Sequence, residues 1–324
     1  MRPTTQKLIA DSCGRYTAAD AVWIDALPDG ERRRLSSLAM CRRCDDTGWA
    51  PVTADGRAHV ERCTCWWDRL GQQHLREARI PPKYRHCTLE NFNTYDHPPL
   101  VLALHTVRTY VGAFPVTPPA AGAKGGVFLQ GPPGVGKSHL AAAAVQEIIA
   151  TTKAWALFYE VRDLLRVIRD SYNPSTQTTE TAVLRPVLRC DLLVLDDLGA
   201  EKTTEWVEET MNYIVNERYS ECRKTYFTSN YLNPPDGIED NLDTFKARVG
   251  ERMYSRLREM CEFVDMHGAD YRERPPNHTD ADLQRMAKTR PAKSMPRQIG
   301  RGIRAHLKGD GKADLKWPGG RAGT

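Results

Sequence analysis

The sequence predicts an α/β protein whose main domain is a doubly wound parallel sheet built around a phosphate-binding loop. Residues 131–138 read G-P-P-G-V-G-K-S and match the P-loop pattern G-x-x-x-x-G-K-[S/T]. Residues 192–195 are fully apolar and are followed by Asp196 and Asp197, as in a buried parallel strand that places acids at its carboxyl end. Strand-like runs alternate with helical patterns along residues 127–266, which is typical of a sheet covered by helices.

The P-loop stretch predicts an ATP site. Its glycines let successive backbone N–H groups turn toward a phosphate, and a helix that begins at Lys137 points its positive end at the same anion. Lys137 is expected to reach the β- and γ-phosphates, and Ser138 to offer its hydroxyl to Mg²⁺, which prefers oxygen ligands. The apolar run at 127–129 and the helix-forming stretch at 140–149 supply the flanks that the motif requires. The residues expected to bind the nucleotide are Gly131, Pro132, Pro133, Gly134, Val135, Gly136, Lys137, Ser138 and Asp196.

The acids after the apolar strand form a Walker B element. We expect Asp196 to hold the water shell of Mg²⁺ and Asp197 to act as the base toward an attacking water. Asn230 follows a predicted strand at residues 224–228, so its side chain is expected to lie between the two motifs and to orient the same water.

Length and composition are those of a globular chain with two or three modules. The chain has 324 residues, of which 40% are hydrophobic, enough for a sizeable core. It contains no run of 18 apolar residues and no secretory pattern at its start, so we expect a cytoplasmic protein that does not contact a membrane. Nine cysteines in a chain that needs intracellular ATP favour free or metal-bound thiols over a disulfide framework.

A small zinc-binding module is expected within residues 1–78. The sequence places C-x-x-C at residues 41–44 and C-x-C at residues 63–65, with few large aliphatic residues between them. Four thiolates around Zn²⁺ close such loops and supply their folding energy. The expected ligands are Cys41, Cys44, Cys63 and Cys65. Because the second pair is unusually tight, the open alternatives are His59, His74 or Cys87 in place of one ligand, or thiols without metal.

The ATPase domain is expected at residues 79–272. Prolines at positions 81 and 82 end a preceding helix and predict a linker, and a short helix around residues 18–38 has no readable function. A helix over 100–114 is expected to pack on the sheet, and residues 117–126 form a loop. The remaining elements expected in order are a strand at 154–159, a helix at 161–170, a loop at 171–181, a strand at 191–196, a helix through 207–215, and strands at 224–228 and 261–266.

A stripe of arginines is predicted near the end of this domain. Arg248, Arg252 and Arg256 recur at helical spacing, beside an apolar stripe formed by Val249, Met253, Leu257 and Met260. Like charges stacked in this way repel by roughly 0.2–0.5 kcal/mol per pair. The stripe therefore favours an anion, such as the γ-phosphate of a neighbouring subunit, over the alternative of a solvated basic face.

At these residues the chain resembles the DnaC/DnaI-type helicase loaders of the AAA+ superfamily, a group that includes the IstB transposase-helper ATPases. The resemblance spans about residues 41–272, and its specificity comes from the combination of segments, since the Walker motifs alone indicate only a P-loop ATPase. The segments that carry it are the cysteine module with Trp49, the lead-in I-P-P-K-Y at 80–84 with T-L-E-N-F at 88–92, the P-loop, L-V-L-D-D-L-G at 193–199, and G-E-R-M-Y-S-R-L at 250–257 with D-Y-R at 270–272.

The resemblance implies an AAA+ ATPase that holds a replicative ring helicase and delivers it onto single-stranded DNA, with the N-terminal module gripping the helicase. It implies self-association through the ATPase domain, with Arg256 as the finger acting on a neighbour, Arg252 as a rival, and Arg272 as sensor 2. A DNA-contacting insertion would fall within 161–187, where Tyr172 is available for stacking, although core packing explains the apolar residues there more simply. Many members have Glu where Asp197 stands; the shorter side chain suits a slow switch better than a motor.

Residues 273–324 are expected to form a basic, disordered tail. They contain twelve Lys or Arg against five Asp or Glu, with many Pro and Gly. The tail would either strengthen DNA binding through phosphate neutralisation or only solubilise the chain. Two alternatives to the loader stay open at this point: an IstB-like transposition helper, and an adaptor that binds DNA and protein without needing hydrolysis. The cysteine module favours the loader.

Overall fold

The computed structural model describes residues 41–54, 57–114, 124–173, 179–201, 204–232 and 244–292, so the helix expected at 18–38 lies outside the described residues. A five-stranded sheet in the order β4-β5-β6-β3-β7 forms the centre of the molecule, and all of its neighbouring strands are parallel. Its strands are β3 (Gly126–Gln130), β4 (Ala156–Glu160), β5 (Leu192–Asp196), β6 (Lys224–Ser229) and β7 (Cys261–Asp265). The predicted doubly wound parallel sheet is confirmed.

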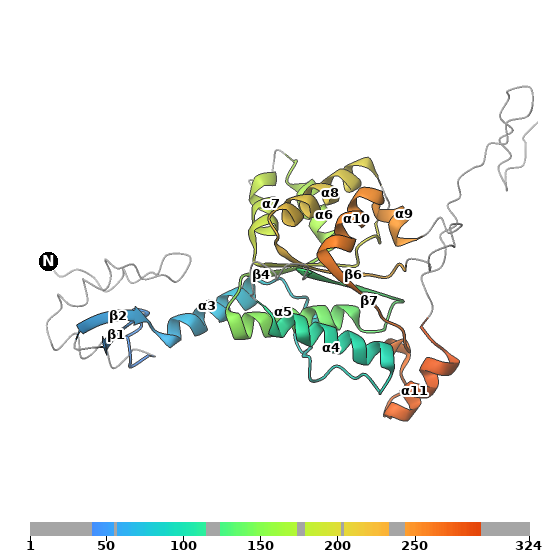
Figure 1. The fold of residues 1–324 in the computed structure, drawn as a ribbon, viewed down its shortest axis with the longest axis horizontal. Coiled ribbons are helices and arrows are strands. Elements are labelled where there is room, and N and C mark those ends of the chain that lie inside the picture. The colour runs from blue at the N-terminus through green and yellow to red at the C-terminus, as the bar shows by residue number, and fades with distance from the viewer. Residues whose placement is uncertain are drawn as a thin grey trace, which may run out of the picture.

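Helices cover both faces of the sheet (Figure 1). On one face lie α4 (Pro98–Gly112) and α5 (Lys137–Thr152), and on the other lie α6 (Val161–Asp170), α7 (Glu180–Arg189), α8 (Glu205–Ser220) and α10 (Glu251–Met260). Successive strand residues point to opposite faces, so Val127 and Leu129 join the core under α4 and α5 while Phe128 joins the other. None of the helices in the described ranges is both long and apolar enough to cross a bilayer.

The N-terminal module is a hairpin followed by a helix that reaches the main domain. Strands β1 (Trp49–Ala54) and β2 (Arg57–Arg62) pair antiparallel, and α3 (Thr64–Glu77) leads from them to the sheet (Figure 1). The two parts are joined where the ring of His74 on α3 contacts the Lys153 carbonyl, at 2.8 Å from Nδ1. The next segment contains the short helix η1 (Pro82–Tyr84) and packs against the ATPase domain. Ile80 is buried, and the Ala78 carbonyl accepts a hydrogen bond from the N–H of Phe158 at 2.8 Å. The segment is therefore not the linker that its prolines predicted.

The chain stays ordered beyond the expected start of the tail. After η2 (Tyr271–Glu273), helix α11 (Asp280–Thr289) begins with a capping box in which the Thr279 and Asp282 side chains bond each other's backbone N–H groups. Leu283 of α11 is fully buried, and Gln284 donates to the Tyr95 carbonyl at 3.0 Å. The expectation of disorder from residue 273 is therefore wrong for residues 273–292, and residues 293–324 lie outside the described ranges.

The arginine stripe is divided between two helices. Gly250, with a φ of 81° that favours glycine, separates α9 (Phe245–Val249) from α10. Arg248 is therefore not in line with Arg252 and Arg256, and the single three-arginine stripe is wrong. The guanidinium of Arg248 lies 3.9 Å from the centre of the Tyr231 ring and donates to the Gly199 carbonyl at 3.1 Å. The apolar stripe of the prediction does face the core, where Val249, Met253 and Leu257 are buried.

Candidate nucleotide site and metal centre

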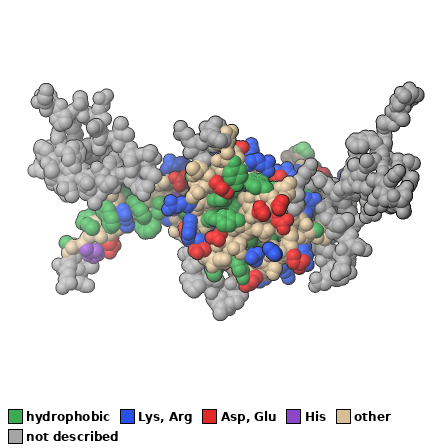
Figure 2. Space-filling view, turned by 90° about the horizontal axis from the view of Figure 1, so that it is seen from above, with side chains coloured by type: hydrophobic (Ala, Val, Ile, Leu, Met, Phe, Trp, Pro, Cys, Tyr) green, Lys and Arg blue, Asp and Glu red, His purple; other side chains and the backbone are tan. Residues whose placement is uncertain are grey.

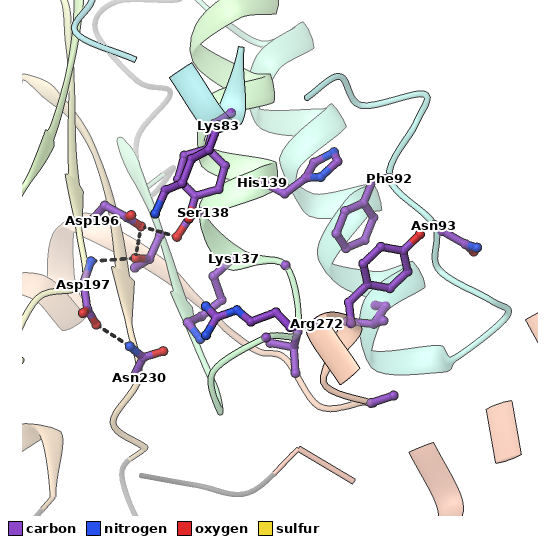
Figure 3. Close-up of a pocket in the computed structure, with 18 of the residues that line it drawn as sticks. Lys83, Phe92, Asn93, Lys137, Ser138, His139, Asp196, Asp197, Asn230 and Arg272 are labelled. Atoms are coloured by element: carbon purple, nitrogen blue, oxygen red, sulfur yellow. Dashed lines mark hydrogen bonds between the residues drawn. The ribbon is translucent and has the colours of Figure 1, made fainter. Parts of the chain in front are cut away.

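The P-loop, the carboxyl ends of the strands and the lead-in segment before α4 enclose a cavity of about 310 Å³ (Figure 3). Most of the predicted site residues meet here. Those that line the cavity are Gly134, Val135, Gly136, Lys137, Ser138, Asp196, Asp197, Asn230 and Arg272. The lining does not include Gly131, Pro132 and Pro133 of the same loop, nor Arg252 and Arg256.

Two P-loop glycines are required by close contacts as well as by conformation. Gly134 and Gly136 have φ values of 86° and 98°. A Cβ on Gly134 would lie 1.9 Å from Oδ1 of Asp270, and one on Gly136 would lie 2.6 Å from the ring of Phe92. The loop is thus held between the lead-in segment and the residues after β7, and any side chain would displace one of them.

Lys137 lies buried inside the loop. Its Nζ donates to the carbonyls of Gly131 and Pro132, at 2.8 Å each. Burial lowers the pKa of Lys137 to about 8, while the charges of Asp197 and Asp196 act in the opposite direction. A cation held in this way, at the start of α5 where backbone N–H groups are free, matches a polyphosphate.

The carboxylate of Asp196 gathers two hydroxyl groups. Its Oδ1 accepts hydrogen bonds from Ser138 Oγ at 2.8 Å and from Thr228 Oγ1 at 2.6 Å. Burial raises the pKa of Asp196, and these hydrogen bonds oppose that rise. A hydroxyl and a carboxylate that converge on one point beside the P-loop are hard oxygen donors and fit Mg²⁺, which supplies charge neutralisation to the phosphates when it is bound. No role was predicted for Thr228 from the sequence, although it ends the same predicted strand that Asn230 follows.

Asp197 is fixed in an uncommon conformation. Its φ is 62°, its backbone N–H donates to Thr228 Oγ1 at 2.9 Å, and the amide of Asn230 donates to its carboxylate (Figure 3). Burial raises the pKa of Asp197, while the charges of Lys137 and Arg162 lower it. Asn230 therefore lies beside Asp197, and both line the same cavity as the P-loop.

Asp197→Asn is expected to preserve nucleotide binding and to lower the rate of ATP hydrolysis by roughly 10²-fold, because the amide cannot accept the proton of the attacking water. Phosphate release and nucleotide affinity, measured on the same preparation, check this. Asp163→Asn is the control, since the carboxylate of Asp163 is exposed on α6 and pairs only with Arg166 at 3.1 Å among the described residues. Undiminished turnover in Asp197→Asn would remove that residue from the role of base.

Aromatic side chains form the other end of the cavity. Tyr84, Phe92, Tyr95 and Tyr271 line it, and His139 meets the Phe92 ring edge-on with 5.3 Å between ring centres. An aromatic end opposite a phosphate-binding end suits the nucleoside part of ATP. The sequence did not predict this half of the site, because its residues come from the lead-in segment and from beyond β7.

The two arginines implied by the family resemblance occupy different places. Arg272 lines the cavity near Lys137 (Figure 3), and its segment is anchored to the P-loop by the N–H of Tyr271, which donates to the Gly134 carbonyl at 3.1 Å. Arg256 lies on α10, where its Nη1 donates to the Arg252 carbonyl at 3.4 Å. The structure therefore brings Arg272 to the nucleotide site of its own chain and does not bring Arg256 there.

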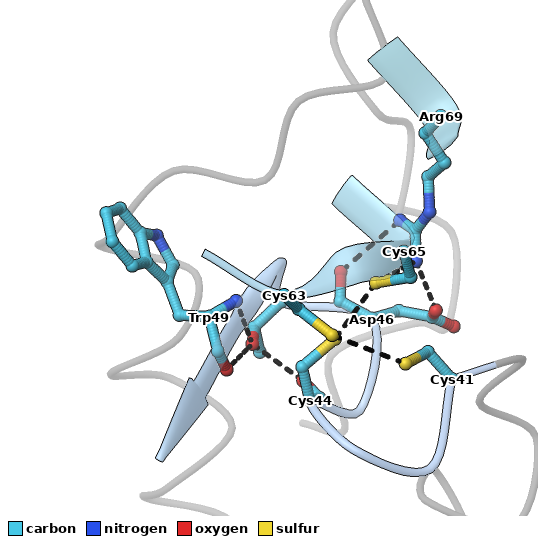
Figure 4. A network of polar contacts seen from close by, with 8 residues as sticks. Cys41, Cys44, Asp46, Trp49, Cys63, Cys65 and Arg69 are labelled. Atoms are coloured by element: carbon cyan, nitrogen blue, oxygen red, sulfur yellow. Dashed lines mark hydrogen bonds and ion pairs between the residues drawn. The ribbon is translucent and has the colours of Figure 1, made fainter. Parts of the chain in front are cut away.

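The four predicted cysteines form one cluster at the base of the hairpin (Figure 4). Their sulfur atoms all lie within 4.8 Å of one another, with Cys41 and Cys63 at 3.7 Å and Cys44 and Cys65 at 3.3 Å. Bonds of about 2.3 Å to a tetrahedral Zn²⁺ would place the sulfur atoms about 3.8 Å apart, so the cluster fits that ion. The alternative ligands are placed elsewhere: His59 pairs with Glu61, His74 contacts Lys153, and Cys87 is buried outside the cluster.

Elemental analysis of the purified chain is expected to give about one zinc per molecule, and Cys41→Ser with Cys44→Ser should lose it, because two ligands are removed from a four-ligand site. The module should then unfold while ATP binding persists, since the cavity lies in the other domain. Cys222→Ser is the control, as that thiol is exposed and lies outside the cluster. A module that is folded and free of metal would contradict the prediction.

Comparisons with known proteins find similarity to an ATP-binding family and to helicase loaders. Residues 121–279 match the family model described as IstB-like ATP binding protein. The replicative helicase loader DnaC of Escherichia coli (strain K12) is 28% identical over 187 residues, which are 58% of this chain and 69% of that protein. The phage-like element PBSX protein XkdC of Bacillus subtilis (strain 168) is 25% identical over 253 residues, which are 76% of this chain and 89% of that protein.

Among solved structures, a crystal structure of the DnaC helicase loader aligns with a TM-score of 0.49 and 28% identity, over 57% of this chain and 99% of that chain. The matched segment 121–279 holds the P-loop, both Walker B acids, Asn230 and Arg272. Through this segment, which is 159 of the 324 residues, the chain is similar to the IstB-like ATP-binding family.

Proposed function

We propose that this chain is an ATP-dependent loader that places a replicative ring helicase onto single-stranded DNA. The observation that carries the proposal is the physical connection between the nucleotide cavity and the four-cysteine module. Helix α3 begins at the cluster and packs on the ATPase domain, and the lead-in segment that follows it reaches Phe92, whose ring touches the P-loop at Gly136. The likeness to DnaC, which is named a replicative helicase loader, supports the same function.

The surface of the module suits a protein partner. Trp49, Val60 and Trp67 are exposed on the hairpin and at the start of α3, where Figure 2 shows hydrophobic side chains along the projecting arm. The guanidinium of Arg62 lies between two tryptophan rings, 3.8 Å from the centre of Trp49 and 4.3 Å from that of Trp66. Exposed aromatic side chains beside arginine are enriched at protein interfaces, so the module is the part of the chain that would grip the helicase.

The end of α6 suits the DNA strand. Tyr172 is 48% exposed, and its ring meets Trp206 edge-on, while the guanidinium of Arg169 lies 4.7 Å from the centre of the Trp206 ring. Aromatic rings with arginine are the means by which bases and phosphates of single strands are bound without sequence preference. Apolar residues of α6 such as Leu164 and Ile168 are buried in the core, as the sequence analysis expected.

The family match itself favours a second candidate, an IstB-like transposition helper, because the matched model is described as an IstB-like ATP binding protein. The similarity to XkdC extends over 253 residues of alignment. It is therefore longer than the family segment at residues 121–279 and includes residues outside that segment. The third possibility is an adaptor that does not need hydrolysis. The Asp197→Asn variant described above tests it, because an adaptor would keep its function when ATP turnover is lost.

Purification of the tagged full chain from its host, with ATP present, tests the proposal. A hexameric helicase is expected to copurify, and the Cys41→Ser, Cys44→Ser variant should lose the helicase while it still binds ATP. The Cys222→Ser variant serves as the matched control and should retain the helicase. Recovery of a transposase without a helicase would sink the loader function and favour the transposition helper.

A further inference from the structure

A third carboxylate, which belongs to neither Walker motif, lines the nucleotide cavity. Glu160 is the last residue of β4 and lies in register with Asp196 on the neighbouring strand β5. Adjacent strands run about 4.8 Å apart, so the two backbones are close neighbours. The Glu160 side chain is half-buried, and no residue in the described ranges forms a hydrogen bond or ion pair with it. Because this carboxylate lines the cavity and has no protein partner among the described residues, it is available to contact whatever the cavity binds.

The alternation of side chains along the strands directs Glu160 to the face of the sheet that carries the P-loop helix. Phe158 and Val194, each two residues before an acid, both belong to the core beneath α4 and α5. Glu160 and Asp196 therefore point to that same face. Since Ser138 at the start of α5 donates to Asp196, Glu160 flanks Asp196 at the Mg²⁺ and γ-phosphate end of the cavity.

The base predicted from the sequence, Asp197, has restricted reach. Its backbone is in the left-handed region, and its carboxylate is occupied by the amide of Asn230. Glu160 has one more methylene than an aspartate, which extends the carboxylate by about 1.5 Å, the length of one carbon–carbon bond. The neighbouring strand thus provides the longer acid that the Walker B strand lacks.

We infer that Glu160 is a second water-activating carboxylate of this ATPase, which acts beside Asp197. The inference rests on the proposed ATP hydrolysis. In that reaction the water oxygen forms a bond to the γ-phosphorus while the bond from that phosphorus to the β–γ bridging oxygen breaks, and the electron pair stays on ADP. Glu160 accepts the proton that the water loses and passes it to the released phosphate. Such proton transfer accounts for rate factors of roughly 10²–10⁴.

Glu160→Gln in the full chain tests the inference. ATP and ADP affinities should stay within about twofold of the wild type, and turnover should fall roughly 10²-fold. The affinity for ADP with aluminium fluoride, a mimic of the transferring phosphoryl group, should fall far more than that for ADP, because the carboxylate acts in the transition state. Glu160→Asp should recover part of the rate. Glu147→Gln is the matched control, since Glu147 is a half-buried glutamate on α5 that does not line the cavity.

Each outcome has one meaning. Wild-type turnover in Glu160→Gln, or an equal loss of affinity for ADP and for its aluminium fluoride complex, overturns the role of Glu160 and leaves the ATPase function standing. A wild-type chain that neither binds nor hydrolyses ATP overturns the proposed function itself. A selective loss of turnover and of transition-state affinity, with Glu147→Gln unaffected, supports the role of Glu160.

Discussion

Lys137→Ala is expected to abolish nucleotide binding, with at least a 100-fold rise in the dissociation constant of ATP, or about 2.7 kcal/mol. Nζ of Lys137 already lies inside the loop, held at 2.8 Å by two carbonyls, so it is directed toward the phosphates before they arrive. Without the lysine, only the backbone N–H groups of the loop would remain to stabilise the negative charge of the phosphates. Calorimetric titration with ATP and Mg²⁺ measures the loss. Lys288→Ala on α11 is the control, because Lys288 is exposed and does not line the cavity.

The same lysine makes nucleotide binding depend on pH. Because burial holds the pKa of Lys137 at about 8, the free protein loses this charge as the pH rises above that value. Bound phosphates stabilise the charged form, so binding takes up a proton above pH 8 and the affinity for ATP should fall by up to tenfold per pH unit. Below pH 8 the lysine is already charged, and its contribution should be constant. Affinity that stays level between pH 8 and pH 10 would contradict the placement of Lys137 against the phosphates.

The parts of the site that depend on local sequence were predictable. The P-loop and the Walker B acids lie on short contiguous stretches whose geometry the pattern fixes, and Ser138 and Asp196 meet as expected. The four cysteines also gather as their spacing predicted, since the pairing of Trp49 with Arg62 brings the two ends of the hairpin together. The Asp-Gly dipeptide at residues 55–56, between alternating segments, was an unused signal for that hairpin.

Other parts depended on tertiary packing. Phe92 and Glu160 reach the cavity from segments outside the P-loop and Walker B motifs, and only the strand order places β4 beside β5. Two predictions were wrong although the local sequence contained a signal against them: the disordered tail, which was inferred from composition, and the single arginine stripe, which was inferred from periodicity. The capping box at Thr279 and Asp282 starts α11 within a stretch that reads as a basic tail, and Gly250 interrupts a helical repeat of arginines.

Arg256→Ala is expected to leave ATP affinity nearly unchanged and to lower hydrolysis by roughly 10³-fold, together with ATP-dependent self-association. The physical reason is that Arg256 lies on α10, outside the cavity of its own chain, so its guanidinium can only reach a γ-phosphate that another copy presents. Its loss would leave the charge that develops on the transferring phosphoryl group unmatched. Arg252→Ala is the matched comparison, one turn earlier on the same helix; a defect in that variant alone would assign the finger to Arg252.

A mixture of variants separates action between subunits from action within one. Arg256→Ala retains an intact P-loop, and Lys137→Ala retains the arginine, so a contact between the two copies contains one complete site. The mixture should therefore hydrolyse ATP faster than the sum of the two variants measured separately, and the gain should depend on total protein concentration. Phosphate release across a series of mixing ratios measures this. If Arg256 acts within its own subunit or only meets solvent, no ratio will exceed the sum, and the assignment between subunits fails.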